Sequence, residues 1–110
     1  DFLVLGLNND QSIRSIKGDD RPVNEELKRA RVLAALGCVD AVVLFGEDTP
    51  LNLINTLTPD VLVKGADWEE HEIVGAAEVK AAGGRVARIP FTSQTSTTGI
   101  IDQIKSANTL

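Results

Sequence analysis

Aromatic residues, cysteine and histidine are scarce in this chain of 110 residues. There is no tyrosine, and tryptophan, cysteine and histidine occur once each. Sixteen acidic residues against eleven Lys and Arg give a formal net charge of −5. The chain therefore lacks the basic surface and the stacking side chains that nucleic-acid binding uses, and we expect no nucleic-acid partner.

Long apolar runs, paired cysteines and the common catalytic motifs are missing as well. No apolar run approaches the roughly 20 residues that a membrane-spanning helix needs, so we expect no membrane partner. Cys38 has no second cysteine to pair with, which fits the reducing cytoplasm, and we expect it to pack as a small apolar side chain. The sequence has no Walker A motif, no G-x-G-x-x-G, no nucleophile elbow and no Cys/His cluster for a metal.

Apolar, β-branched stretches alternate with helical patterns along the chain. The expected strands are 2–7, 39–45, 60–64 and 85–91. The expected helices are 12–17, 25–36, 50–58, 71–82 and one that begins at 95–97. Such alternation indicates βα units, hence a doubly wound parallel α/β sheet with helices on both faces, in one domain of residues 1–110.

Several details of these elements are predicted from local patterns. Asn24 is expected to cap the helix over 25–36, and Gly37 to end it in the left-handed conformation. The last helix is expected to bury Ile100, Ile101 and Ile104. The strand over 2–7 is apolar throughout, which is typical of a strand buried on both faces.

Ligands of doubly wound sheets bind beyond the carboxyl ends of the strands, so the residues that follow each strand are candidates for a site. Asn8, Asn9 and Asp10 follow the first strand, where they would line a site or serve only as a turn and helix cap. Lys17 and Arg21 flank a glycine-containing loop, where they would bind an anion or remain solvated surface charges.

Two further strand ends carry polar groups. Lys64, Gly65 and Asp67 follow the third strand, where Gly65 would admit a ligand or merely form a tight turn capped by Asp67. Trp68 would stack on a base or, as we prefer, cover the edge of the sheet. Hydroxyl side chains dominate 93–98, which would hold phosphate at a helix N-terminus or simply cap the helix. His71 lies in a charged stretch and is expected at the surface.

Taken together, these segments resemble the cytidylyltransferase-like nucleotidyltransferases, and more narrowly the adenylyltransferase domain of enzymes that make ADP-heptose. The segments that carry the resemblance are 7–10, 17–24, 34–40, 47–50, 59–67 and 96–98. Glycerol-phosphate cytidylyltransferases carry Arg-Tyr where this chain has Gly37 and Cys38, which favours the heptose branch. The resemblance implies a Rossmann-like nucleotidyltransferase fold.

The resemblance also implies an activity. Such an enzyme transfers AMP from ATP to D-glycero-β-D-manno-heptose 1-phosphate with Mg²⁺, releasing pyrophosphate, in lipopolysaccharide core biosynthesis. A cytidylyltransferase acting on glycerol 3-phosphate, or a non-catalytic nucleotide-binding or assembly module, remain alternatives. Lys17 is the expected catalytic cation; the expected nucleotide- and phosphate-binding residues are Asn8, Asp10, Arg21, Lys64, Gly65, Asp67, Ser96, Thr97 and Thr98.

The sequence departs from this family at one point. The signature H-x-G-H is missing, since the single histidine is His71. In the family this motif follows a strand that lies between the strands expected here at 2–7 and 60–64. We therefore expect an empty position in the sheet, a domain that lacks some 25–30 N-terminal residues, and an inactive fragment. The resemblance further implies a sugar kinase domain, fused or separate, and a homo-oligomer.

Overall fold

Four parallel strands form two separate pairs in the computed structural model, which describes residues 1–93 and 95–107. β1 (Val4–Asn8) pairs with β2 (Ala41–Phe45), and β3 (Val61–Gly65) pairs with β4 (Arg85–Ile89). The four expected strands are thus confirmed, with ends displaced by at most two residues. In the described chain β1 and β3 do not pair with each other, so each keeps one edge without a strand partner.

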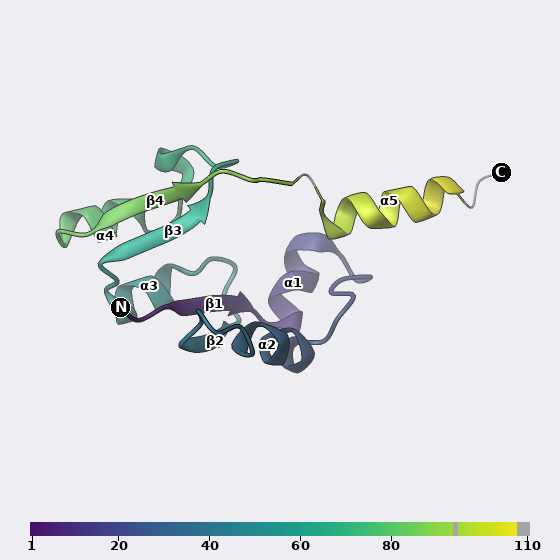
Figure 1. Cartoon of the computed structure of the whole chain (residues 1–110), viewed down its shortest axis with the longest axis horizontal. Coiled ribbons are helices and arrows are strands. Elements are labelled where there is room, and N and C mark those ends of the chain that lie inside the picture. Colours follow the sequence, from purple (N-terminus) through teal and green to yellow (C-terminus); the bar gives the residue numbers. More distant parts are fainter. Residues whose placement is uncertain (94, 108–110) are drawn as a thin grey trace.

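Helices occupy the connections between the strands, as the alternating pattern predicts. They are α1 (Asp10–Lys17), α2 (Glu26–Ala34), α3 (Leu51–Leu57), the 3₁₀ turn η1 (Glu70–Glu72), α4 (Ala76–Ala81) and α5 (Thr97–Ala107). α2 packs on β2, while α4 packs on β3 and β4. The strands of each pair run parallel because a helical crossover returns the chain to the starting end of the sheet. Figure 1 shows the arrowheads of β1, β3 and β4 pointing toward the side of the molecule on which α5 lies.

Local backbone geometry corrects three of the expected helix details. α2 begins one residue later than expected and has no side-chain cap, so the Asn24 cap is wrong. α2 ends at Ala34 and the following Ala35 is in a right-handed conformation, so a left-handed exit at Gly37 is wrong too. The helix expected over 71–82 is interrupted at Gly75, whose φ of 88° cannot continue a right-handed helix. The exit at Gly83 is left-handed, with φ 89°.

The buried apolar core is small and lies beside α3 and α4. Among the described residues it consists of Ile54, Ile73, Ala76 and Val79. The residues of β1 are half-buried or exposed, rather than enclosed on both faces as their apolar run predicts. The accessible surface is 8134 Å², whereas a folded monomer of this mass exposes roughly 5,900 Å². Much apolar surface is therefore left uncovered.

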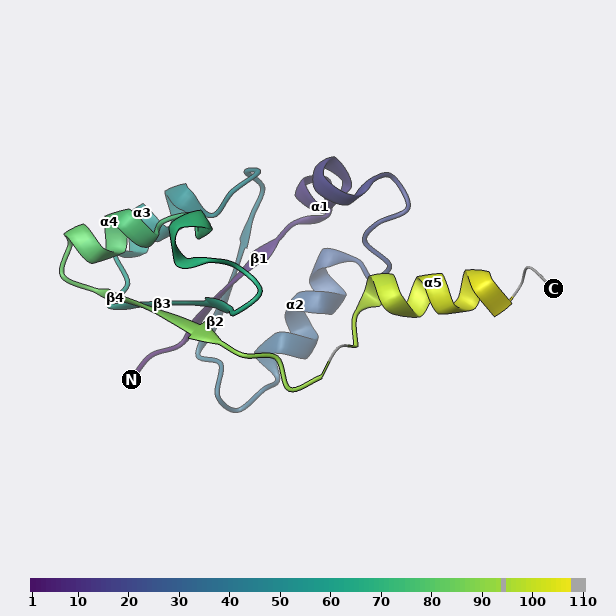
Figure 2. The same cartoon turned by 90° about the horizontal axis from the view of Figure 1, so that it is seen from above.

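The last helix accounts for part of this exposure. α5 projects from the rest of the molecule in both views (Figures 1 and 2). The radius of gyration is 15.8 Å, against about 13 Å for a compact chain of this length. Ile100 is 49% and Ile104 56% exposed, so the prediction that they are buried is wrong. The apolar face of α5 exists, but no sheet surface lies beneath it.

Candidate active site

A buried hydrogen-bond network connects the end of β1 with the end of β2. Asn9 caps α1, because its Oδ1 accepts from the backbone N of Ser12 at 2.9 Å. Asn8 Nδ2 donates to Ser12 Oγ at 2.9 Å, and Ser12 Oγ donates to the carbonyl of Glu47 at 3.1 Å. Ser12 is only 1% exposed. The cap interpretation is right for Asn9, while the Asn8 side chain is held by Ser12.

Arg29, on α2, also contacts the end of β1. It forms an ion pair with Asp10 at 2.9 Å and donates to the carbonyl of Asn8 at 2.9 Å. Loss of solvent around the Asp10 carboxyl would raise its pKa. Hydrogen bonds from the Arg29 side chain and the Glu26 backbone, together with the charges of Arg29 and Arg14, outweigh that effect. They lower the pKa of Asp10 below its usual value. Asp10 is therefore an anion whose charge is already paired.

The loop after α1 is joined to the start of α5. Arg21 Nη2 donates to Thr98 Oγ1 at 2.9 Å, across 77 positions of sequence. Lys17 is the exposed last residue of α1, and Gly18 follows it with a φ of 102°, which turns the chain into the loop. Two segments expected to bind phosphate thus meet, one contributing cations and the other hydroxyl groups.

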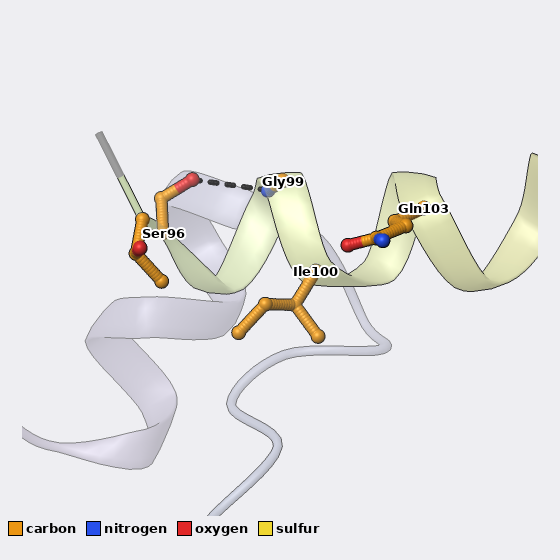
Figure 3. A pocket seen from close by; sticks show the side chains of 5 residues that line it. Ser96, Gly99, Ile100 and Gln103 are labelled. Atoms are coloured by element: carbon orange, nitrogen blue, oxygen red, sulfur yellow. Dashed lines mark hydrogen bonds between the residues drawn. The ribbon is translucent and has the colours of Figure 1, made fainter. Parts of the chain in front are cut away.

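The start of α5 carries an open pocket. Ser96 Oγ accepts from the backbone N of Gly99 at 3.0 Å and so caps the helix, as Figure 3 shows. Thr97 is the first residue of the helix. The pocket has a volume of about 340 Å³ and is lined by Thr95, Ser96, Gly99, Ile100 and Gln103. Its hydroxyl and amide side chains and its place at a helix N-terminus are suited to an anion, and one hydroxyl serves as the cap.

The end of β3 forms a separate cluster. The Lys64 ammonium lies 5.6 Å from the centre of the Trp68 ring, in a cation–π contact. A side chain at position 65 would clash, because a Cβ there would lie 2.8 Å from Asp67 Oδ1 and 2.8 Å from the Phe91 ring. A side chain at position 65 would therefore displace the Asp67 carboxylate and the exposed Phe91 ring from their present positions. None of the contacts described for these residues joins them to the loop that carries Arg21.

Two residues of the site region were not expected from the sequence. Arg29 has the pattern of a solvent-facing helix residue, and Ser12 that of an ordinary residue in a short helix. Their roles depend on contacts with residues distant in sequence: Ser12 binds the carbonyl of Glu47, and Arg29 binds the carbonyl of Asn8. Cys38 is exposed, contrary to its expected packing, and His71 is exposed, as expected.

No group of three or more His, Cys, Asp or Glu side chains in residues 1–93 and 95–107 is arranged to hold a metal ion. Within the same ranges, no helix is both long and apolar enough to cross a membrane.

Comparison with known proteins identifies the family. The cytidylyltransferase-like family model matches residues 1–103, so the chain belongs to the cytidylyltransferase-like family. The lipopolysaccharide core biosynthesis protein from Thermoplasma volcanium has a similar fold, with a TM-score of 0.64 and 23% identity. That likeness covers 86% of this chain and 76% of the other. The expected α/β nucleotidyltransferase fold is thereby confirmed.

Much higher identity relates the chain to proteins named bifunctional protein HldE. The Methylobacillus flagellatus protein is 56% identical over 96% of this chain, and that of Mesorhizobium japonicum is 55% identical over 99%. The Citrifermentans bemidjiense protein is 54% identical over 97%. In each case the chain spans 22% of the relative's length. The resemblance inferred from the sequence is therefore confirmed for the segment of those proteins that this chain matches.

Proposed function

We propose that this domain transfers AMP from ATP to D-glycero-β-D-manno-heptose 1-phosphate, giving ADP-heptose and pyrophosphate for lipopolysaccharide core biosynthesis. One observation carries the proposal: the Arg21–Thr98 hydrogen bond brings the cationic loop to the hydroxyl-rich start of α5. Cations and helix N–H groups that converge in this way favour a polyphosphate. The identity with the bifunctional HldE proteins supports the choice of sugar and of adenine.

The reaction needs no covalent intermediate. A phosphate oxygen of the sugar phosphate attacks the α-phosphorus of ATP, the bond to the bridging α–β oxygen breaks, and pyrophosphate leaves with that oxygen. Catalysis then consists of positioning and of stabilising negative charge. Lys17 and Arg21 neutralise phosphate charge, and Ser96, Thr97 and Thr98 hold the β- and γ-phosphates.

The remaining expected site residues have supporting roles in this proposal. Asn8 and Asp10 form the wall at the end of β1, and the turn Lys64–Gly65 with Asp67 faces the nucleoside. Mg²⁺ supplies further charge neutralisation when it is bound to the triphosphate. We assign the ion to the nucleotide, because Mg²⁺ in such sites is typically held by substrate phosphates with one or two carboxylates rather than by an all-protein cage.

We also propose that the domain is completed by a further parallel strand between β1 and β3. The unpaired edges of both strands and the excess of exposed surface support this arrangement. The H-x-G-H motif implied by the family would follow that strand. Amide hydrogen exchange on the full protein tests the idea: edge amides of β1 and β3 should be protected, and rapid exchange along both edges would rule the strand out.

The wider context is proposed on the same basis. The word bifunctional in the relatives' names, and the 22% of their length that the chain spans, fit a sugar kinase domain in the same polypeptide. We place the protein in the cytoplasm, where ATP is available, and expect a homo-oligomer. Size-exclusion chromatography with light scattering tests the last point, and a monomeric mass would contradict it.

Pyrophosphate release by the full protein tests the activity directly. We expect turnover with ATP and the heptose 1-phosphate, and none with CTP and glycerol 3-phosphate. Turnover only with CTP would instead support the cytidylyltransferase alternative, and nucleotide binding without turnover the non-catalytic module. Lys17→Ala should lower turnover at least tenfold, about 1.4 kcal/mol of barrier. The exposed Lys28 on α2 provides the control, because Lys28→Ala should leave the rate unchanged.

A further inference from the structure

A single side chain, that of Arg29, joins the β1–α1 junction to the start of α2. Arg29 Nε donates to the carbonyl of Asn24, Nη1 to the carbonyl of Asn8, and Nη2 to Asp10 Oδ1, each at 2.9 Å. The Arg29 side chain is 17% exposed, which is low for an arginine on a surface helix. The planar guanidinium fits three acceptors at once, whereas a lysine ammonium is a point charge on a flexible stem.

The three acceptors lie at the two ends of the segment that leads from β1 through α1 to α2. Asn8 and Asp10 lie where β1 ends and α1 begins, and Asn24 lies where the connection between α1 and α2 ends. Glu26 adds a fourth contact, because its Oε1 accepts from the backbone N of Asp10 at 3.2 Å. The first turn of α2 is thus fixed to the first turn of α1. The connection over 18–25, which includes Arg21, runs from the last turn of α1 to this fixed first turn of α2.

Charge points to the same role. An unpaired Asp10 carboxylate beside a phosphate site would repel the ligand, and Arg29 neutralises it. The nitrogens of Arg29 are bound to protein oxygens, whereas Arg21 donates to the Thr98 hydroxyl at the start of α5. The two arginines therefore have different tasks.

We propose that Arg29 is a positioning residue: it fixes the α2 end of the 18–25 connection to the end of β1 and the start of α1, and thereby places Arg21 for binding the triphosphate. The inference rests on the proposed function. It assigns Arg29 no contact with the substrate, so its effect on binding passes through Arg21.

A double-mutant cycle measures that dependence. In the full protein, the Kd for ATP is determined by isothermal titration for the wild type, Arg29→Lys, Arg21→Ala and the double variant. We expect Arg29→Lys to weaken ATP binding about tenfold in the wild type but less than threefold once Arg21 is gone. Arg31→Lys is the matched control, because Arg31 is exposed on the same helix and should leave the Kd unchanged. Equal effects of Arg29→Lys in both backgrounds would overturn the inference.

Hydrogen exchange provides a readout that does not need activity. Arg29→Lys should accelerate amide exchange within 18–25 at least tenfold while the strands keep their protection, and Arg31→Lys should not. Unchanged exchange there overturns the inference, whether or not the protein makes ADP-heptose. Absence of turnover in the wild type, with the accelerated exchange present, would overturn only the proposed function. If Arg29→Lys does not fold, Asp10→Ala removes one of the three acceptors and should give a smaller acceleration, whose absence is equally decisive.

Discussion

Ser12→Ala should destabilise the protein by about 2 kcal/mol, although it removes a single oxygen from a short helix. Ser12 Oγ is the partner of both Asn8 Nδ2 and the Glu47 carbonyl, at 2.9 and 3.1 Å. The site is almost completely closed to solvent, so water cannot replace the oxygen. Leaving a buried polar group without its partner costs about 1–3 kcal/mol, and the better helix propensity of alanine recovers less than about 0.7 kcal/mol.

The assay is urea unfolding of the full protein, followed by far-ultraviolet circular dichroism. In thermal unfolding, the same loss of about 2 kcal/mol would correspond to a decrease in Tm on the order of 10 °C for a domain of this size. Ser15→Ala is the control, because Ser15 lies on the same helix and is exposed. It should be neutral or slightly stabilising. A Ser12→Ala protein within about 0.5 kcal/mol of Ser15→Ala would refute the reasoning from the buried network.

Three further predictions address charge, ligand and backbone. Because the pKa of Asp10 is lowered in the folded protein, its stabilising contribution is complete above the unfolded value of 3.8 and is lost as the pH falls through the lower folded pKa. Asp10→Asn should therefore lower the Tm above pH 4, with a difference that shrinks at lower pH; a constant difference would contradict this. Thr97→Ala should weaken binding of ATP more than of the sugar phosphate in titration calorimetry, and equal losses would indicate only a helix cap. Gly75→Ala should cost more than about 1 kcal/mol in urea unfolding, since its φ is 88° and the new Cβ would lie 2.6 Å from Ile54 Cδ1. Gly37→Ala, with no atom within 4 Å of the new Cβ, should be neutral, and equal losses in both variants would count against the argument.

Local patterns predicted the strands well and the helix ends less well. The four strands were found because each is a short apolar run bounded by polar or turn residues. The break at Gly75 is not predicted, because the residues on both sides fit a helical pattern and the lack of room for a Cβ beside Ile54 is visible only in the fold. The exposure of Ile100 and Ile104 was missed for another reason: an apolar helix face shows that a partner is expected, not that one is present.

The candidate site was predicted in part. Arg21 and Thr98 were both selected from the sequence, but their hydrogen bond depends on how the α1–α2 loop approaches α5. Arg29 could not be selected, because a charged residue on a helix is usually solvated and its three acceptors lie 5 to 21 positions away.

The sequence by itself therefore determined the order of strands and helices, the polar character of the strand ends and the family, because these follow from periodicity and from short motifs. The tertiary structure decided which polar groups meet: Ser12 with Glu47, Arg29 with Asp10, and Arg21 with Thr98. It also decided that the strands pair in twos, leaving an edge of β1 and an edge of β3 without a partner in the described chain. Such pairings depend on the path of the whole chain, since contacts between distant segments are not encoded in either segment alone.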